Sequence, residues 1–353
     1  MVTDPRVIDY LSTHRKKIAY LAGTVVFIAI LAIMSIVICP IRISIPDAFI
    51  AFFKHIAGVE PDNYRDYLID YHVWNNLPRA ICALLAGAIL ACGGAAMQSM
   101  IRNPLADPYT LGISSGALFG MVVWAVLGIS IVPFVSSGDA PFVNAFIMAM
   151  VPTIVVLLMS MFKKVSPTTM ILCGIGVMYI FNAFTTILKY TTESDILKDL
   201  YLWTVGSIGG LVWGSLPKIA FAFLLCFIPM MIFRNQLDIV SQGDTNAISL
   251  GVNPNRLRLF FMILISISVA IIVCYTGTIG FVGLVAPHIA RIFVGSKSSV
   301  LIPCSAVIGA TMVFTADCVV RMLFPTLSVG VILAIICSPI FIYILMRMKR
   351  SAW

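Results

Sequence analysis

Few residues of this 353-residue chain are spaced for catalysis or for metal binding. It contains neither HExxH, the helix motif of zinc proteases, nor GxxxxGK[ST], the phosphate-binding loop of ATPases. His14, His55 and His72 are far apart and are expected in loops. His288 is expected at an inner helix end, hydrogen-bonded or facing the cytoplasm, because no metal-ligand partners accompany it. We therefore expect no catalytic residue, no bound metal and no cofactor in this chain.

Carboxylates are the next candidates, because ion-coupled transporters place Asp or Glu inside membrane spans. Here Asp107, Asp195, Asp238 and Asp244 fall in connections between apolar runs. Asp317 is the exception, and Arg321 follows it by one helical turn. A local ion pair explains this spacing, and a coupling site is the alternative role for Asp317. With almost no charge inside the apolar runs, we expect another chain to supply the energy.

Nine cysteines could suggest disulfides or a metal centre, but no CxxC pair occurs. Seven of them lie in or beside apolar runs, at positions 82, 92, 173, 274, 304, 318 and 337. Buried cysteine behaves as a small apolar residue. We expect these cysteines to have a packing role.

The composition excludes a soluble enzyme. The chain is 60% hydrophobic and 11% charged, with a mean hydropathy of +1.04, whereas soluble domains carry about 25% charged residues. Apolar runs recur from residue 18 to residue 346 without a long polar stretch. We expect an all-α, polytopic membrane bundle, with residues 1–353 forming a single transmembrane domain. The formal charge of +8 then reflects membrane topology, and we expect no nucleic-acid partner.

A membrane-spanning helix needs about 20 apolar residues. This criterion predicts about ten spans, both ends of each being approximate. The spans are Ile18–Cys39, Ala80–Met100, Leu111–Val132, Phe142–Phe162, Thr168–Leu188, Leu216–Phe233, Leu257–Tyr275, Ile279–Val294, Ser299–Val319 and Leu327–Met346.

The orientation follows from the distribution of Lys and Arg, which favour the cytoplasmic side. With the N-terminus inside, fifteen of the 23 basic residues fall on the inner side and eight on the outer side. All clusters of adjacent basic residues are inside, among them Arg15-Lys16-Lys17 and Lys163-Lys164. We therefore expect both termini in the cytoplasm.

Two connections are longer than the others. The outer one, Pro40–Arg79, should contain a helix capped by Ser44 or Asp47, followed by a solvated rim at Glu60–Tyr71. The inner one, Asn235–Arg258, should contain a short helix that ends on Gly251. Asn253-Pro254 then begins a new turn. A partner subunit could bind this inner helix-turn-helix.

Small residues are concentrated in several spans, where they allow close helix contacts. Between two of these spans the chain is interrupted by Arg102-Asn103-Pro104-Leu105-Ala106-Asp107-Pro108. Two prolines four residues apart cannot continue a lipid-facing helix, so protein, water or a partner must cover this segment. The polar and aromatic stretch Tyr201–Trp213 is expected outside or in the outer leaflet.

Five blocks of this sequence resemble the FecCD-type permeases, the membrane subunits of ABC importers for iron-siderophores, haem and cobalamin. The first block is Gly87–Gly116, with Gln98 and the interrupted segment. The others follow in the family's order along nearly the whole chain: Trp203–Ser207, Leu250-Gly251 with Arg256, Gly280–Arg291, and Asp317 with Arg321.

The resemblance implies a ten-helix permease subunit in the cell membrane. It implies a second permease copy forming a homodimer, with the pathway along the dimer axis. It implies a cytoplasmic ABC ATPase dimer that binds ATP and Mg²⁺, and an extracytoplasmic binding protein that delivers a metal chelate. It also implies two related halves of inverted topology.

The resemblance further implies roles for particular residues. The ATPase-coupling loop comprises Ser249, Leu250, Gly251, Asn253, Arg256 and Arg258. The cytoplasmic gate comprises Ser166, Thr168 and Thr169. Arg79 and Arg321 dock the binding protein. Residues of the pathway or its packing are Gln98, Asn103, Pro104, Trp203, Gly206, Ser207, Gly280, Gly283, Pro287 and His288.

Two outer motifs depart from the family pattern. The family usually has Arg-x-Pro-Arg before its second span, where this chain has Asn76-Leu77-Pro78-Arg79. Near the end it has Glu-Leu-Pro-Val-Gly, where this chain has Thr326-Leu327-Ser328-Val329-Gly330. These changes leave the chelate unidentified. The alternative function is a secondary transporter or channel driven by an ion gradient, with Asp317 as its best residue.

Overall fold

The computed structural model describes residues 23, 26, 43–162 and 166–347. Every regular element among them is helical. In chain order these are α2 (Ile45–Ile56), α3 (Tyr64–Ile101), η1 (Pro108–Leu111), α4 (Ile113–Leu127), α5 (Ala140–Phe162), α6 (Pro167–Tyr190), α7 (Ser194–Thr204), η2 (Trp213–Ser215), α8 (Leu216–Ile232), α9 (Arg234–Ser241), α10 (Asp244–Ser249), α11 (Pro254–Thr276), α12 (Val282–Val294), α13 (Ser298–Leu323) and α14 (Val329–Arg347).

Nine of the ten predicted spans coincide with apolar helices. Within the described residues, six helices are long and apolar enough to cross a membrane, and three shorter apolar helices occupy the positions of α4, α12 and α14. The tenth predicted span, Ile18–Cys39, lies outside the described residues. The helical membrane bundle is thereby confirmed, whereas the total of ten spans and the cytoplasmic location of the termini stay predictions.

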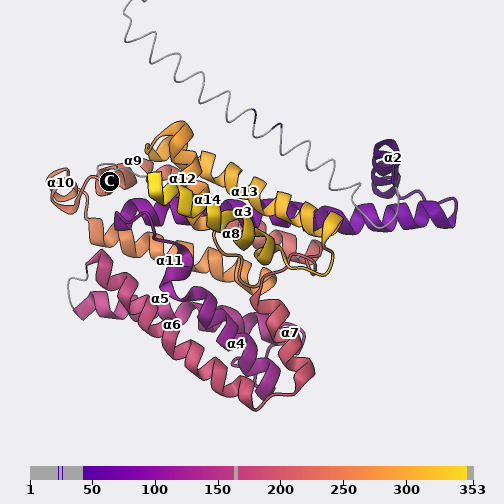
Figure 1. Ribbon diagram of the computed structural model, residues 1–353, viewed down its shortest axis with the longest axis horizontal. Coiled ribbons are helices and arrows are strands. Elements are labelled where there is room, and N and C mark those ends of the chain that lie inside the picture. Colours follow the sequence, from indigo (N-terminus) through magenta and orange to yellow (C-terminus); the bar gives the residue numbers. More distant parts are fainter. Residues whose placement is uncertain (1–22, 24–25, 27–42, 163–165, 348–353) are drawn as a thin grey trace, which may run out of the picture.

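Helix α3 forms the centre of the bundle (Figure 1), where it packs against α8, α11, α12 and α13. From Gly87 to Ile101 every residue of α3 is buried. Alanine, glycine and serine supply much of this stretch, so its backbone can approach its neighbours closely. The sequence shows no polar face here because α3 is surrounded on all sides.

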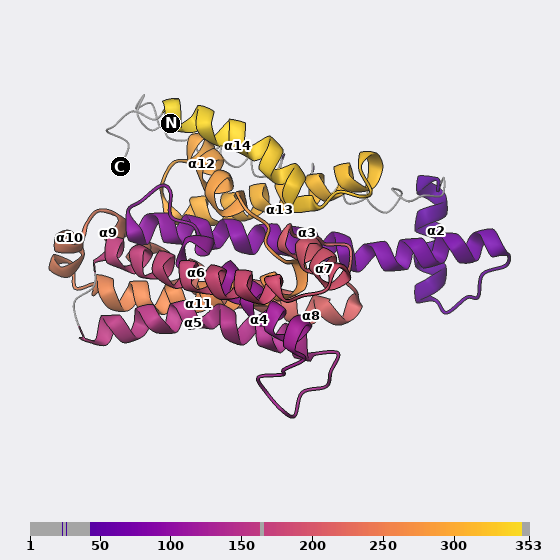
Figure 2. The ribbon, with the colours of Figure 1, turned by 60° about the horizontal axis from the view of Figure 1, so that its bottom comes forward.

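The predicted solvated rim at Glu60–Tyr71 is exposed over most of its length, and it is helical from Tyr64 onward. Helix α3 has 38 residues and is therefore about 57 Å long, whereas a membrane core is about 30 Å thick. Its first turns project from the bundle, and α2 lies across them (Figure 2). Ala48 and Ala51 of α2 pack on Ile69 and Val73 of α3. This apolar contact holds the two crossing helices together outside the bundle.

The bundle has two distinct ends, named here the α2 end and the α10 end (Figure 2). Helices α3 and α5 run from the α2 end to the α10 end, and α11 and α13 run in the opposite direction. The sets α3–α6 and α11–α14 thus repeat one order of helices with inverted directions. The second helix of each set, α4 or α12, has 15 or 13 residues, too few to cross about 30 Å.

Candidate functional site

The two short helices α4 and α12 begin at irregular segments that meet beside the middle of α3. Before α4, the chain leaves α3 at Arg102, which has a left-handed φ of 55°. Before α12, Phe281 has a φ of 69°. The Tyr109 hydroxyl accepts a hydrogen bond from the Ile279 amide at 3.4 Å. Two interrupted helices that meet inside a membrane bundle are typical of the binding regions of transporters.

The interrupted segment Arg102–Pro108 is held by its own polar groups. The Asn103 side-chain oxygen accepts a hydrogen bond from the Leu105 amide at 2.9 Å, and Pro104 lies within that turn. The Thr110 hydroxyl donates to the Asp107 carbonyl at 2.6 Å. These hydrogen bonds satisfy backbone groups of the segment that form no hydrogen bonds within a helix.

Asp107 falls in a connection, as expected, but it is buried rather than solvated. It is 5% exposed, and no hydrogen-bond partner is found for its Oδ1 atom. A Cβ atom added to Gly283 would lie 2.5 Å from this Oδ1 and 3.1 Å from the Leu90 carbonyl oxygen. The connection therefore folds back to the depth of Leu90, in the middle of α3. A contact with α12, nearly 180 positions later in the sequence, produces this burial.

Gln98 joins α3 to α12 and is fully buried. Its Nε2 atom donates to the Gly283 carbonyl at 3.2 Å, and its Oε1 atom accepts from Arg291 Nη1 at 2.7 Å. The same helices touch at Gly94, where an added Cβ atom would overlap the Gly283 backbone. Gln98 and Gly283, both predicted in the pathway or its packing, are thus brought into contact.

His288 is hydrogen-bonded, as expected, but it does not face the cytoplasm from a helix end. It lies in the middle of α12 next to Pro287, is 4% exposed, and its Nδ1 atom donates to the Leu284 carbonyl at 2.7 Å. Its ring meets Phe341 of α14 edge-on at 5.9 Å between centroids. Packing of α14 over α12 covers a residue that hydropathy alone would leave at the boundary.

The second interrupted segment is the connection between α11 and α12. The predicted residues Trp203, Gly206 and Ser207 lie beside it. The Ser207 amide donates to the Thr276 carbonyl at 2.7 Å. Gly206 has a φ of 75°, and its carbonyl accepts from the Gly330 amide at 3.3 Å. Three connections, after α7, after α11 and before α14, are joined in this way. Gly280 lies in the same region and has open space where a Cβ atom would be.

Asp317 is fully buried near the α2 end of α13 and is held by two arginines. Arg321 forms the expected local ion pair, with 3.1 Å between Nε and Oδ2. Arg79 of α3, 238 positions away in the sequence, donates to Oδ1 from Nε at 2.9 Å and from Nη2 at 2.6 Å. The side chains of Arg79 and Arg321 are only 19% and 9% exposed. Their docking role stays a prediction, and each also neutralises a buried carboxylate.

At the α10 end, the side chain of Arg258 is buried between helices and is not exposed to a partner. It is 1% exposed, and its Nε atom donates to the Met100 carbonyl at 2.8 Å. Its Nη1 atom donates to Asp244 Oδ2 at 2.8 Å, and Nη2 pairs with Oδ1. These hydrogen bonds hold the pKa of Asp244 below its usual range. Arg258 therefore fixes the start of α10 against the end of α3.

The remaining predicted coupling residues surround an exposed surface at the α10 end. Helix α10 ends before Gly251, which has a φ of 79°, and Asn253 caps α11 by accepting from the Arg256 amide at 3.1 Å. Ile248 and Leu250 are 65% and 64% exposed. All of the following six residues are exposed, and we define them as the α10 surface: Ile248, Ser249, Leu250, Gly251, Asn253 and Arg256.

A groove of about 610 Å³ separates this surface from the start of α6. Ser166 and Pro167 form one wall, and Ile248, Gly251 and Asn253 form the other. Ser166 caps α6, accepting from the Thr169 amide at 3.2 Å. Thr168, in the first turn of α6, is exposed. The predicted gate and the predicted coupling loop are thus neighbours across one groove.

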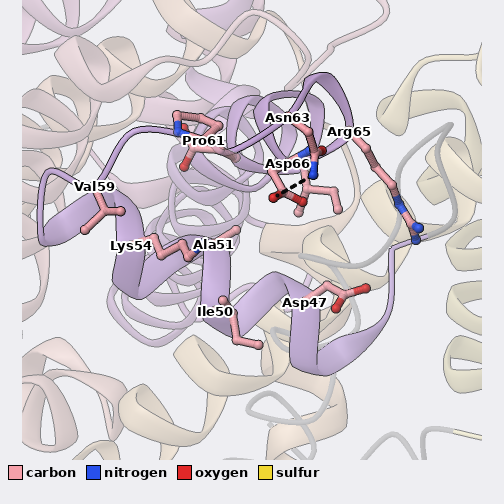
Figure 3. A pocket seen from close by; sticks show the side chains of 11 residues that line it. Asp47, Ile50, Ala51, Lys54, Val59, Pro61, Asn63, Arg65 and Asp66 are labelled. Carbon is pink, nitrogen blue, oxygen red and sulfur yellow. Dashed lines mark hydrogen bonds between the residues drawn. The ribbon is translucent and has the colours of Figure 1, made fainter.

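A second pocket, of about 240 Å³, lies at the α2 end between α2 and the projecting start of α3. Figure 3 shows side chains of both signs around it, among them Asp47, Lys54, Arg65 and Asp66. Lys54 pairs with Asp62 at 2.8 Å. We call this part of the molecule the α2–α3 arm (residues 45–77). The sequence does not indicate this pocket, because it requires two helices to cross.

One further sequence pattern, Gly112-Ile113-Ser114-Ser115-Gly116, has the GxSxG spacing of serine hydrolases. In those enzymes the serine lies on a sharp turn between a strand and a helix. Here the segment follows a 3₁₀ turn, and the serine of the pattern, Ser114, lies in the first turn of α4. The structural context of a nucleophile is therefore missing.

The arrangement of helices and interrupted segments defines a membrane permease. The model of the FecCD transport family matches residues 27–347, and the chain belongs to this family. It is 36% identical over 340 residues to the Fe(3+)-citrate import system permease protein YfmE of Bacillus subtilis, covering 95% of this chain and 97% of that one. It is 32% identical over 285 residues to the hemin transport system permease protein HmuU of Yersinia pestis, covering 80% and 85%.

A solved structure supports the same assignment. It is described as an inward-facing conformation of a metal-chelate type ABC transporter, and it matches with a TM-score of 0.80 at 27% identity. The match covers 94% of this chain and 99% of that chain. This protein is therefore a multi-span membrane protein with the fold of an ABC permease subunit.

Proposed function

We propose that this chain is the permease subunit of an ATP-driven importer for a metal chelate: an iron-siderophore, haem or a corrinoid. The observation that carries the proposal is the α10 surface. Ile248 and Leu250 are each more than 60% exposed on a short helix that the Arg258–Asp244 pair fixes to α3. Exposed apolar side chains on a rigid element are typical of a binding site for another protein.

The partner at the α10 surface is a cytoplasmic ABC ATPase dimer. The chain has no phosphate-binding loop of its own, so ATP and Mg²⁺ bind to the partner. ATP binding would move α10, and Arg258 would transmit this movement to the end of α3 through the Met100 carbonyl. A shift of α3 reaches α12 through Gln98, and the cytoplasmic gate at Ser166 lies across the groove from α10.

A second copy of the chain completes the pathway. Helix α6 is a candidate for the shared axis, because Gly176, Tyr179, Asn182 and Thr186 are exposed on it beside apolar residues such as Ile187. A purely lipid-facing helix would present apolar side chains, as α8 does. Two copies of α6 facing each other would line a path with small, hydroxyl and aromatic groups.

An extracytoplasmic binding protein delivers the chelate to the α2 end. The α2–α3 arm projects furthest from the bundle there (Figure 2), and Arg65, Lys54 and Asp66 lie around its pocket. Arg79 and Arg321 are less accessible and bind Asp317. Substituting both with Glu would therefore break a buried ion-pair network as well as test docking, whereas Arg65→Glu tests docking alone.

The test of the coupling assignment uses the double variant Ile248→Glu, Leu250→Glu. It should abolish ATP-dependent uptake of the chelate in vesicles that contain the whole transporter, and co-purification of the ATPase with the permease should be lost. Phe134→Glu is the matched control, since Phe134 is 96% exposed and lies in the connection before α5, outside the α2–α3 arm and away from the α10 surface. Full uptake by the double variant would show that the ATPase does not bind at α10.

The alternative is a transporter driven by an ion gradient, and the unpaired Oδ1 atom of buried Asp107 is the observation that favours it. Buried carboxyl groups inside a membrane bundle commonly mark proton or ion sites. Uptake should then persist without ATP hydrolysis, collapse when the gradient is dissipated, and be lost in Asp107→Asn. Under the proposed function, uptake instead follows ATP and is insensitive to the gradient.

A further inference from the structure

A third cavity, unrelated to the predicted site residues, lies at the α2 end between α5, α8 and α11. It has a volume of about 710 Å³, within the range of small-molecule sites in proteins. Its walls are mainly aromatic and aliphatic, with Phe142, Val143, Phe146, Phe221, Ile271 and Tyr275. Phe142 of α5 stacks on Tyr275 of α11 with 5.0 Å between ring centroids. We call this cavity the lateral groove.

The lateral groove lies at one end of three candidate membrane-spanning helices, α5, α8 and α11. Helix α5 begins at Ala140 and α8 begins at Leu216, so both begin at the mouth of the groove. Phe146 is six residues into α5, which corresponds to a depth of about 9 Å. This is the depth at which a lipid passes from its headgroup to its acyl chains.

The surface around the groove faces lipid rather than water. Helix α8 exposes Phe221, Leu224, Ile228 and Ile232, between 47% and 67% each, and all four are apolar. The exposed residues of α6, by contrast, include the polar Asn182 and Thr186 beside apolar ones. Continuity with an apolar, lipid-facing helix indicates that acyl chains have access to the groove.

The mouth of the groove carries one charge of each sign. Lys218, in the first turn of α8, and Asp139, just before α5, are both exposed and both line the groove. Lys218 Nζ lies 5.4 Å from the centroid of the Tyr275 ring, and Asp139 Oδ2 accepts from the Ser136 hydroxyl at 2.9 Å. Within the part of the chain that the structure describes, no ion pair joins Lys218 to Asp139.

We propose that the lateral groove binds one molecule of phosphatidylethanolamine. The lipid phosphate binds Lys218, its primary ammonium binds Asp139, and an acyl chain lies along Phe146 and Phe221. Phosphatidylglycerol carries no cation for Asp139, so its binding leaves that carboxylate unmatched. Phosphatidylcholine has a quaternary ammonium without N–H donors and cannot hydrogen-bond to Asp139.

The test is native mass spectrometry of the full-length permease in nanodiscs with equal amounts of dioleoyl-phosphatidylethanolamine, -phosphatidylglycerol and -phosphatidylcholine. The wild type should retain phosphatidylethanolamine preferentially. Lys218→Ala should lower retention of phosphatidylethanolamine by about tenfold, the loss expected for a charge-assisted hydrogen bond. Asp139→Asn should shift the preference to phosphatidylglycerol, because only the cation remains at the mouth. Lys198→Ala, at an exposed lysine of α7, is the control and should bind like the wild type.

A variant that fills the groove separates the acyl-chain contact from the headgroup contact. Val143→Trp keeps both charges and should lose the retained lipid. Asp139 is exposed, so Asp139→Asn is expected to fold, and its lipid preference tests the contact with the ammonium group. The proposal is overturned if Asp139→Asn keeps the lipid preference of the wild type, or if Lys218→Ala retains as much phosphatidylethanolamine. It is also overturned if Val143→Trp releases a second permease copy, which would mean that a protein occupies the groove.

Discussion

Arg256 and Arg258 are two positions apart at the start of α11, and their environments are opposite. Arg256 is exposed, whereas Arg258 is 1% exposed and its guanidinium contacts Asp244 and the Met100 carbonyl. A helix turns by about 200° over two residues, so one side chain faces solvent and the other faces α3. The sequence suggests equal roles for the two arginines, and the structure distinguishes them.

We therefore predict different effects for the two alanine variants. Arg258→Ala should destabilise the permease by about 2 to 3 kcal/mol, because it leaves a buried carbonyl and a carboxylate without their donor. Arg256→Ala should leave stability unchanged and reduce only ATP-dependent uptake. Thermal unfolding in detergent measures the first quantity, and vesicle uptake the second. Equal unfolding temperatures for the two variants would contradict the structural role of Arg258.

Asp317 supports a second prediction at this scale. Asp317→Asn removes the charge that neutralises Arg79 and Arg321, whose side chains are 19% and 9% exposed. Breaking a buried ion pair costs about 3 to 5 kcal/mol. Thermal unfolding should show this loss in the single variant, and Arg79→Gln combined with Asp317→Asn should lose less than the sum of the two single variants. Strict additivity would mean that the two residues do not interact.

Helix pairs in this bundle approach closely where glycine meets backbone. Gly87 of α3 faces Gly309 of α13, and Gly94 of α3 faces Gly283 of α12, and an added Cβ atom at either position would overlap the opposite backbone. Backbone cannot move aside as a flexible side chain can. The first contact positions α13 and the second positions α12, which Gln98 also joins to the α10 end of α3.

We predict that Gly94→Ala disrupts folding, whereas Gly176→Ala is tolerated. Overpacking of a tight contact costs about 1 to 3 kcal/mol or more, and Gly94 has no space for a methyl group. Gly176 of α6 has nothing within 4 Å of an added Cβ atom. Fluorescence-detected size-exclusion chromatography of both variants gives the comparison. A monodisperse Gly94→Ala protein with wild-type stability would show that α3 and α12 are less closely packed.

From the distribution of Lys and Arg we predict that the α10 surface lies in the cytoplasm and the α2–α3 arm outside. The two ends of the bundle differ in chemistry as well. The α10 end presents the apolar pair Ile248 and Leu250, and the arm presents mixed charges around a small pocket. These surfaces suit a permanent ATPase partner and a transient binding protein, respectively.

Cysteine labelling checks this orientation. A membrane-impermeant maleimide should label Asp62→Cys in intact cells, and Ser249→Cys only after the cells are opened. Asp62 and Ser249 are both exposed. Background from native cysteines should be low, since seven of the eight described ones are buried, and the unsubstituted protein serves as the control. Labelling of Ser249→Cys in intact cells would show that the α10 surface lies outside, opposite to the predicted orientation.

Hydropathy and charge are local properties, and the features that depend on them could be predicted from the sequence. These are the nine apolar helices, the cap of α2 by Ser44 and the short helix before Gly251; the orientation, which also depends on them, stays a prediction. The family signature from Gly87 to Gly116 likewise needs only adjacent residues.

Contacts between distant segments were decided by the tertiary structure alone. Arg79 meets Asp317 across 238 positions, Asp107 becomes buried because α12 covers it, and the start of α3 remains helical because α2 packs on it. Hydropathy sums over neighbours in the chain and carries no information about which helices face each other. The positions of charged groups inside this bundle therefore follow from helix packing, which local sequence patterns do not encode.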